Sequence, residues 1–170
     1  MFRALARLFP AAVIWAMVAV MLTGFVFTRI TDTDPAHKIT VYVWCEVRNA
    51  PELAERLERE LDGAVRMVKV HPFGYAMFGS EAIRTADLYI VPDSQKEEYR
   101  DWFAPEDGEA EASGIPVYDP DTGMNVAGTY FVYTPEGVPP EPYRLYVGIA
   151  SPHREDGLAR RAAELLMAVK

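Results

Sequence analysis

The sequence predicts an α/β fold: a three-layer, mostly parallel sheet with helices on both faces and a C-terminal antiparallel pair, preceded by one transmembrane helix. Two observations predict this class. Segments rich in β-branched and aromatic residues alternate with amphipathic helical segments, an order that favours right-handed crossovers between parallel strands. Ahead of them, residues 8–28 form an apolar run without a single charge. A length of 170 residues allows one domain plus such an appendage.

Residues 1–31 are predicted to be an uncleaved signal-anchor. The run at 8–28 reads LFPAAVIWAMVAVMLTGFVFT, and as a helix it spans about 30 Å, the hydrocarbon thickness of a bilayer. Arg3 and Arg7 precede the run, which favours an N-terminus in the cytoplasm. We therefore expect residues 8–28 to contact membrane lipid as a single pass.

Two other interpretations of this segment fit its residues less well. A cleaved signal peptide needs small residues at its exit site, whereas residues 24–28, GFVFT, are mostly bulky. A buried soluble helix seldom stays apolar on all sides for this length. With the anchor retained, residues 32–38 form a short linker and residues 39–170 an extracytoplasmic domain at the cell membrane.

The first half of this domain is predicted to alternate strands and helices. Residues 38–45, KITVYVWC, lack polar alternation, as a strand covered on both faces does. Residues 51–63 form a helix with Asn49 as N-cap, Pro51 near N1 and leucines at four-residue spacing. Alternating apolar and basic residues at 64–70 predict a strand near an edge of the sheet. The remaining elements are a short helix at 76–84, a buried strand at 86–91 and a helix at 95–103 with Tyr99, Trp102 and Phe103 on its apolar side.

The second half is less regular. Residues 104–125 are rich in acids, glycine and proline, which predicts a surface excursion. Residues 128–134 and 143–150 have strong strand composition and are expected to pair with each other antiparallel, across a connection too long for a tight turn. A C-terminal helix begins near Asp156, and its apolar face holds Leu158, Ala162, Leu165, Leu166 and Val169.

Composition excludes several classes of function. The formal charge is −8, and because residues 1–31 carry three arginines and no acid, the rest of the chain carries −11. An acidic domain repels phosphate backbones, so nucleic-acid binding is disfavoured. The single cysteine, Cys45, excludes an internal disulfide and a multi-cysteine metal site. The three histidines lie far apart in sequence and no glycine-rich phosphate motif is present, so we expect no metal and no cofactor.

Catalytic candidates are weak. A hydrolase would have to use Asp93, Ser94 or His71, and no two of these have diagnostic spacing. The stretch 119–123, DPDTG, superficially matches a calcium loop, but its third ligand position is glycine, so a tight turn is the simpler interpretation. We therefore expect no catalytic residues and a protein that is not an enzyme.

The carboxyl ends of the predicted parallel strands are the expected place for a ligand or partner. These ends fall at residues 45–48, 71–74 and 92–94. Tyrosines and tryptophans are concentrated on the strands and their ends, which predicts either a binding edge or ordinary core packing.

Three segments also resemble a known family. KITVYVWCEVRN at 38–49, TADLYIVPDS at 85–94 and YRLYVGIASPHREDGLARRAAELL at 143–166 resemble the first lobe of extracellular solute-binding proteins of ABC transporters. In that family an opening strand of the form K-I-x-V-Y-x-W and a later strand ending in I-V-P-[DE]-S lead to the ligand cleft. The resemblance implies an α/β lobe with ligand contacts at Trp44, Cys45, Glu46, Asp93 and Ser94.

The chain departs from the family because it is long enough for only one of the two lobes. A single lobe offers half a cleft, in which a small ligand stays largely wet. We therefore predict a membrane-anchored extracytoplasmic domain that recognises a partner without catalysis, the partner being a membrane transporter or other protein subunit, or a second copy. The alternatives are a minimal solute site, an accessory or structural subunit of a membrane complex, and a hydrolase.

Overall fold

The computed structural model describes residues 13–24, 34–74, 80–105 and 112–169. The chain divides into two compact units, Met1–Asp34 and Pro35–Lys170. In the first unit residues 13–24 are helical, and their large apolar side chains are exposed, with Trp15 at 72% and Met21 at 76%. Among the helices of the described residues, none combines the length and the hydrophobicity that crossing a bilayer requires. The flanks of the predicted anchor, residues 8–12 and 25–28, lie outside the described residues.

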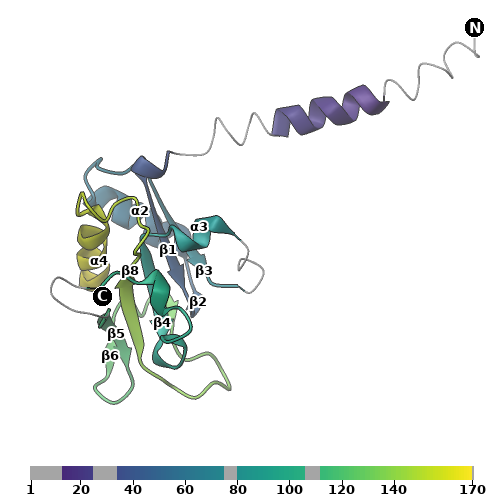
Figure 1. The fold of residues 1–170 in the computed structure, drawn as a ribbon. Coiled ribbons are helices and arrows are strands. Elements are labelled where there is room, and N and C mark those ends of the chain that lie inside the picture. The colour runs from purple at the N-terminus through teal and green to yellow at the C-terminus, as the bar shows by residue number, and fades with distance from the viewer. Residues whose placement is uncertain (1–12, 25–33, 75–79, 106–111, 170) are drawn as a thin grey trace, which may run out of the picture. The chain divides into compact units, whose positions relative to one another are not determined.

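The second unit contains a mixed six-stranded sheet in the order β3-β1-β4-β8-β5-β6 (Figure 1). Strand β1 is parallel to both β3 and β4, whereas the β4–β8, β8–β5 and β5–β6 pairs are antiparallel. The sheet strands are β1 (Lys38–Val43), β3 (Met67–Pro72), β4 (Leu88–Pro92), β5 (Ile115–Asp119), β6 (Met124–Asn125) and β8 (Tyr143–Val147). A two-stranded sheet pairs β2 (Glu46–Val47) with β7 (Phe131–Val132).

The helices cover the large sheet unequally. Helices α2 (Ala50–Glu60) and α4 (Leu158–Ala168) pack on one face, and the short α3 (Glu81–Arg84) packs on the other with the 3₁₀ helix Arg100–Trp102. Another 3₁₀ helix, Asp93–Gln95, follows β4 directly. A further 3₁₀ helix, Pro35–His37, leads into β1. The α/β class and the helices on both faces are confirmed, but the description of the sheet as mostly parallel is wrong.

The antiparallel half of the sheet follows from where the chain re-enters it. The loop before β8 reaches the carboxyl end of β4, where the Asp93 N–H donates to the Pro142 carbonyl at 2.9 Å. Strand β8 therefore starts at the carboxyl edge and runs back against β4. The described residues between these strands form no α-helix, the usual crossover between parallel strands.

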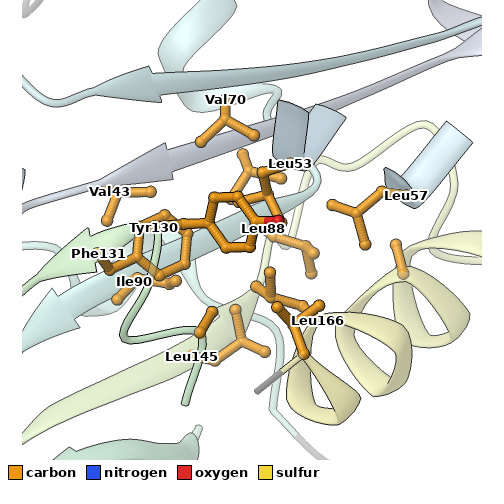
Figure 2. Close-up of a cluster of buried hydrophobic side chains, with 14 of the residues drawn as sticks. Val43, Leu53, Leu57, Val70, Leu88, Ile90, Tyr130, Phe131, Leu145 and Leu166 are labelled. Atoms are coloured by element: carbon orange, nitrogen blue, oxygen red, sulfur yellow. The ribbon is translucent and has the colours of Figure 1, made fainter. Parts of the chain in front are cut away.

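The core beneath α2 and α4 is built from branched apolar side chains. Leu53 and Leu57 of α2 meet Leu88 and Ile90 of β4, and Leu166 of α4 completes the layer (Figure 2). The predicted strands at 38–45 and 86–91, the helix at 51–63 and the C-terminal helix are thus confirmed in kind. The strand predicted at 64–70 is the edge strand β3, which begins three residues later.

One helix prediction is wrong. Residues 95–103 form turns and a 3₁₀ helix in place of an α-helix. Their rings spread across three strands: Tyr99 contacts Trp44 at the end of β1, Trp102 contacts Tyr89 of β4, and Phe103 stacks on Tyr146 of β8. A single helical stripe is too narrow to cover that width.

The predicted pairing of 128–134 with 143–150 is also wrong. Tyr130 and Phe131 are both buried, and Figure 2 shows both rings in the core close to Leu53 and Ile90. A straight strand would send successive side chains to opposite faces. The backbone therefore turns here, and only Phe131–Val132 pairs, with Glu46–Val47 of β2.

The predicted surface excursion at 104–125 is wrong in part. Residues Ile115–Asp119 join the sheet as β5, because Val117 enters the core and is completely buried. Pro116 is exposed at an irregularity in the register with β8, where a missing N–H is tolerated. The acidic run at 106–111 and residues 76–79 of the predicted short helix lie outside the described residues.

Asn49 occupies the N-cap position of α2, as expected, but it caps by backbone geometry alone. Its φ of 51° is left-handed, and its side chain makes no capping hydrogen bond. Asparagine tolerates this conformation better than most residues do. The Asn49 carbonyl accepts the N–H groups of Glu52 and Leu53 instead.

Candidate functional site

An aromatic row crosses the sheet face opposite α2 and α4. The strand register aligns His71, Tyr42, Tyr89 and Tyr146 on β3, β1, β4 and β8 in turn. The first pair is stacked, with ring centroids 5.5 Å apart. Side chains two residues further along each strand lie on the same face. The row therefore leads directly to the carboxyl ends of β1 and β3.

At those ends two rings form a stacked pair that is only half buried. The Trp44 and Phe73 ring centroids lie 3.8 Å apart with an interplanar angle of 10°. Tyr99 touches both, at 5.0 and 5.6 Å, and Trp102 lies 4.9 Å from Tyr99. Trp44, Phe73 and Trp102 retain solvent exposure while Tyr99 is buried. We call these four residues the aromatic edge.

Two buried polar atoms in this aromatic cluster lack a hydrogen-bond partner. They are Trp44 Nε1 and the Tyr146 hydroxyl, and they are the only such side-chain atoms among the residues that the structure describes. A buried donor left unpaired costs about 1–3 kcal/mol. Burial, and after it the charge of Asp93, raises the pKa of Tyr146 to about 12. The hydroxyl thus stays protonated and able to donate.

Asp93 is held by a neighbouring strand. Arg144 Nε donates to its carboxylate at 3.1 Å, and the same guanidinium reaches the carbonyls of Ser113 and Gly114. Ser94 is exposed, and its backbone N–H donates to Glu141 at 3.1 Å. Both residues that were predicted at the end of β4 therefore lie at the carboxyl edge of the sheet, directly after this strand, and anchor the loops around it.

Cys45 and Glu46 do not join the aromatic edge. Cys45 lies in the core beneath α2 and α4, where burial raises the pKa of its thiol to about 12, so it is an inert apolar residue. Glu46 is exposed on β2 and lies 3.6 Å from Arg48. Of the five predicted residues, Trp44 is the one whose ring belongs to the aromatic edge, and the sequence missed the roles of Phe73, Tyr99 and Trp102.

A buried polar network at the amino end of β4 was not predicted. Asp87 is 1% exposed, and its carboxylate accepts the Thr40 N–H at 2.7 Å and the Ser151 hydroxyl at 2.5 Å. Burial raises the pKa of Asp87 against the lowering effect of these hydrogen bonds. The network joins β1, β4 and the segment before α4.

His153 extends the network but does not activate Ser151. Its Nδ1 lies 2.8 Å from Asp156, and its Nε2 lies 3.0 Å from the Pro35 carbonyl. Both ring nitrogens thus face other acceptors, while Ser151 donates to Asp87. This arrangement fixes the chain entry at Pro35 to the start of α4, and it does not form a serine–histidine relay. His71 and Ser94, the other hydrolytic candidates, are on β3 and just beyond β4.

A cavity of about 450 Å³ lies between α4 and the sheet. Its lining includes Leu145 and Val147 of β8, Arg160 and Glu164 of α4, and Arg154. None of the five predicted site residues lines it. The sequence carried no signal for it, because its walls come from segments that are separated along the chain.

Comparisons with protein-family models, with curated proteins and with solved structures found no match to this chain.

Proposed function

We propose that this chain is a membrane-anchored extracytoplasmic recognition domain, related to one lobe of a solute-binding protein, that binds a protein partner at its aromatic edge without catalysis. The observation that carries the proposal is the partly exposed stack of Trp44 on Phe73. Tryptophan and other aromatic residues are enriched in protein interfaces and dominate their binding energy.

The position of the stack supports a partner that approaches from the carboxyl side. The chain enters the domain at Pro35–His37, immediately before β1, whereas Trp44 follows the other end of that strand. Six extended residues separate these ends by about 20 Å. Trp44 therefore lies at the end of β1 that is remote from Pro35–His37.

The first unit supports an anchor in lipid. Every residue from 13 to 22 is apolar, and successive positions of a helix are rotated by about 100°, so apolar side chains face all directions. A helix that is apolar all round needs an apolar surrounding. The charge-free run extends this pattern to residues 8–28.

Site-directed photo-crosslinking in host membranes tests the proposal. Phe73→p-benzoylphenylalanine places the probe at the aromatic edge, and Glu164→p-benzoylphenylalanine places it on the exposed face of α4 as a control. We expect one discrete cross-linked species from position 73 that is lost when Trp44→Ala is added, and none from position 164. Equal cross-linking from the two positions would argue against a specific edge.

The 450 Å³ cavity favours a second candidate, a minimal solute site, because ligand pockets commonly measure about 300–1,000 Å³. Thermal unfolding with a metabolite panel separates the two candidates. A melting temperature that rises with ligand concentration, and that responds to a variant of the cavity but not of the aromatic edge, supports the solute site.

A further inference from the structure

The surroundings of the aromatic edge are acidic. Residues 93–103 carry four acids and two bases, and residues 135–142 carry two acids and no base. The two segments are joined at the edge, because the Ser94 N–H donates to Glu141. The acids concerned are Asp93, Glu97, Glu98, Asp101, Glu136 and Glu141.

Part of this charge is available to a partner. Arg144 is already engaged with Asp93 and two backbone carbonyls, so it does not offset the other acids fully. Glu97 is 74% exposed and lies 3.8 Å from Arg100, the length of a loose surface pair. Glu97 and Glu98 directly precede Tyr99 in the chain, and the charge of Glu97 also contributes to the raised pKa of Tyr146, after burial and Asp93. The carboxylates therefore lie beside the aromatic edge.

The aromatic side offers matching chemistry. A cation is attracted to the face of a tryptophan or phenylalanine ring, and more so where the site is partly desolvated. Trp44, Phe73 and Trp102 each keep part of their surface exposed, so a cation can reach these rings from solvent.

We propose that the partner presents a lysine- or arginine-bearing segment, whose cation lies against the Trp44–Phe73 stack within reach of Glu97. This inference rests on the proposed recognition function and names its partner chemistry. A second copy of the chain is a poorer occupant, because two domains of formal charge −11 repel each other.

The test uses the full chain in nanodiscs of zwitterionic phosphatidylcholine, which do not themselves attract basic peptides. Tryptophan fluorescence is followed while acetyl-RGKGR-amide, its acidic counterpart acetyl-EGDGE-amide or its neutral counterpart acetyl-QGNGQ-amide is added. We expect saturable binding of the basic peptide that weakens with added salt, and no saturation with the other two peptides.

Two matched variants locate the binding. Glu97 and Glu164 are both exposed and both lie 3.8 Å from an arginine on their own segment. We expect E97Q to weaken the binding of the basic peptide about threefold and E164Q to leave that binding unchanged. W44A should weaken it about fivefold or more, and where W44A fails to fold, W44F should give a smaller loss because a ring remains.

The outcomes separate this inference from the proposed function. Equal weakening by E97Q and E164Q, or equal binding of the three peptides, overturns the cationic partner. If the basic peptide shows no saturable binding while Phe73→p-benzoylphenylalanine still cross-links in membranes, recognition at the edge stands and the cationic chemistry of the partner is rejected. Failure of both experiments rejects both.

Discussion

Replacement of Gly148 by alanine should destabilise the domain strongly, because no space exists for a methyl group at this position. A Cβ built on Gly148 would lie 2.0 Å from the Ala86 carbonyl oxygen and 3.1 Å from the Tyr89 ring. Carbon and carbonyl oxygen approach to about 3.3 Å at closest, so the two backbones would have to separate by more than about 1 Å.

The magnitude follows from what that separation breaks. The Gly148 N–H donates to the Asp87 carbonyl at 2.8 Å, a bond that a displacement of this size loses. Overpacking a dense site costs about 1–3 kcal/mol, and one net backbone hydrogen bond contributes about 0.5–1.5 kcal/mol. We expect G148A to lower the free energy of unfolding by about 2–4 kcal/mol.

Gly74→Ala is the matched control, because a Cβ at Gly74 would meet no atom within 4 Å and its φ is not left-handed. Urea unfolding of both full-length variants in a mild detergent, followed by tryptophan fluorescence, measures the difference. G74A should stay within about 0.5 kcal/mol of the parent. A G148A variant as stable as G74A would show that β4 and β8 are not packed as closely as the register requires.

Three further predictions concern the core beneath α2 and α4 and the polar network. Leu57→Ala should lower the free energy of unfolding in urea by about 3 kcal/mol, because Leu57 lies on the buried face of α2 and is only 1% exposed. A loss below about 1 kcal/mol would contradict that burial. Cys45 should resist a thiol reagent at mildly alkaline pH and react fully in urea, since burial raises its pKa to about 12; rapid labelling of the native protein would refute this. Burial raises the pKa of Asp87 in the folded protein. The carboxyl group therefore stabilises the fold most at pH values below the pKa of the unfolded chain, near 4, and less as the pH rises through the pKa of the folded protein. The difference in free energy of unfolding between the parent and Asp87→Asn should therefore shrink from about pH 3 to about pH 7. A difference that grows over this range would show that the pKa of Asp87 is lowered by folding.

Sequence patterns predicted the elements whose side chains follow a regular period. The run at 38–45 and the leucines of 51–63 became β1 and α2 because their apolar residues are spaced as a strand or helix core requires. The same logic failed where bulky rings outweighed local propensity. Tyr130 and Phe131 are neighbours that are both buried, which no straight strand permits, so a sequence of strand composition became a turn.

The sequence predicted the location of the candidate site but not most of the residues that form it. The carboxyl ends of β1 and β4 were expected to hold it, and they do place Trp44 and Asp93 at one edge of the sheet. Strand-end reasoning could not tell that Cys45, one residue after Trp44, turns into the opposite core. Phe73 was recoverable, because the stretch 71–74 was itself a predicted strand end.

The irregular cover of the aromatic face explains why its edge is suited to recognition. A long helix over this face would have buried the rings of β1 and β3 uniformly, as α2 and α4 do on the other side. The 3₁₀ segment ending in Trp102 covers Tyr89 and Tyr99 but leaves Trp44 and Phe73 partly exposed. Rings of this kind have few rotatable bonds, so a partner that covers them orders little additional freedom. The surface left open is therefore apolar, rigid and bordered by carboxylates, and these properties favour a protein partner over a small solute that would stay largely wet.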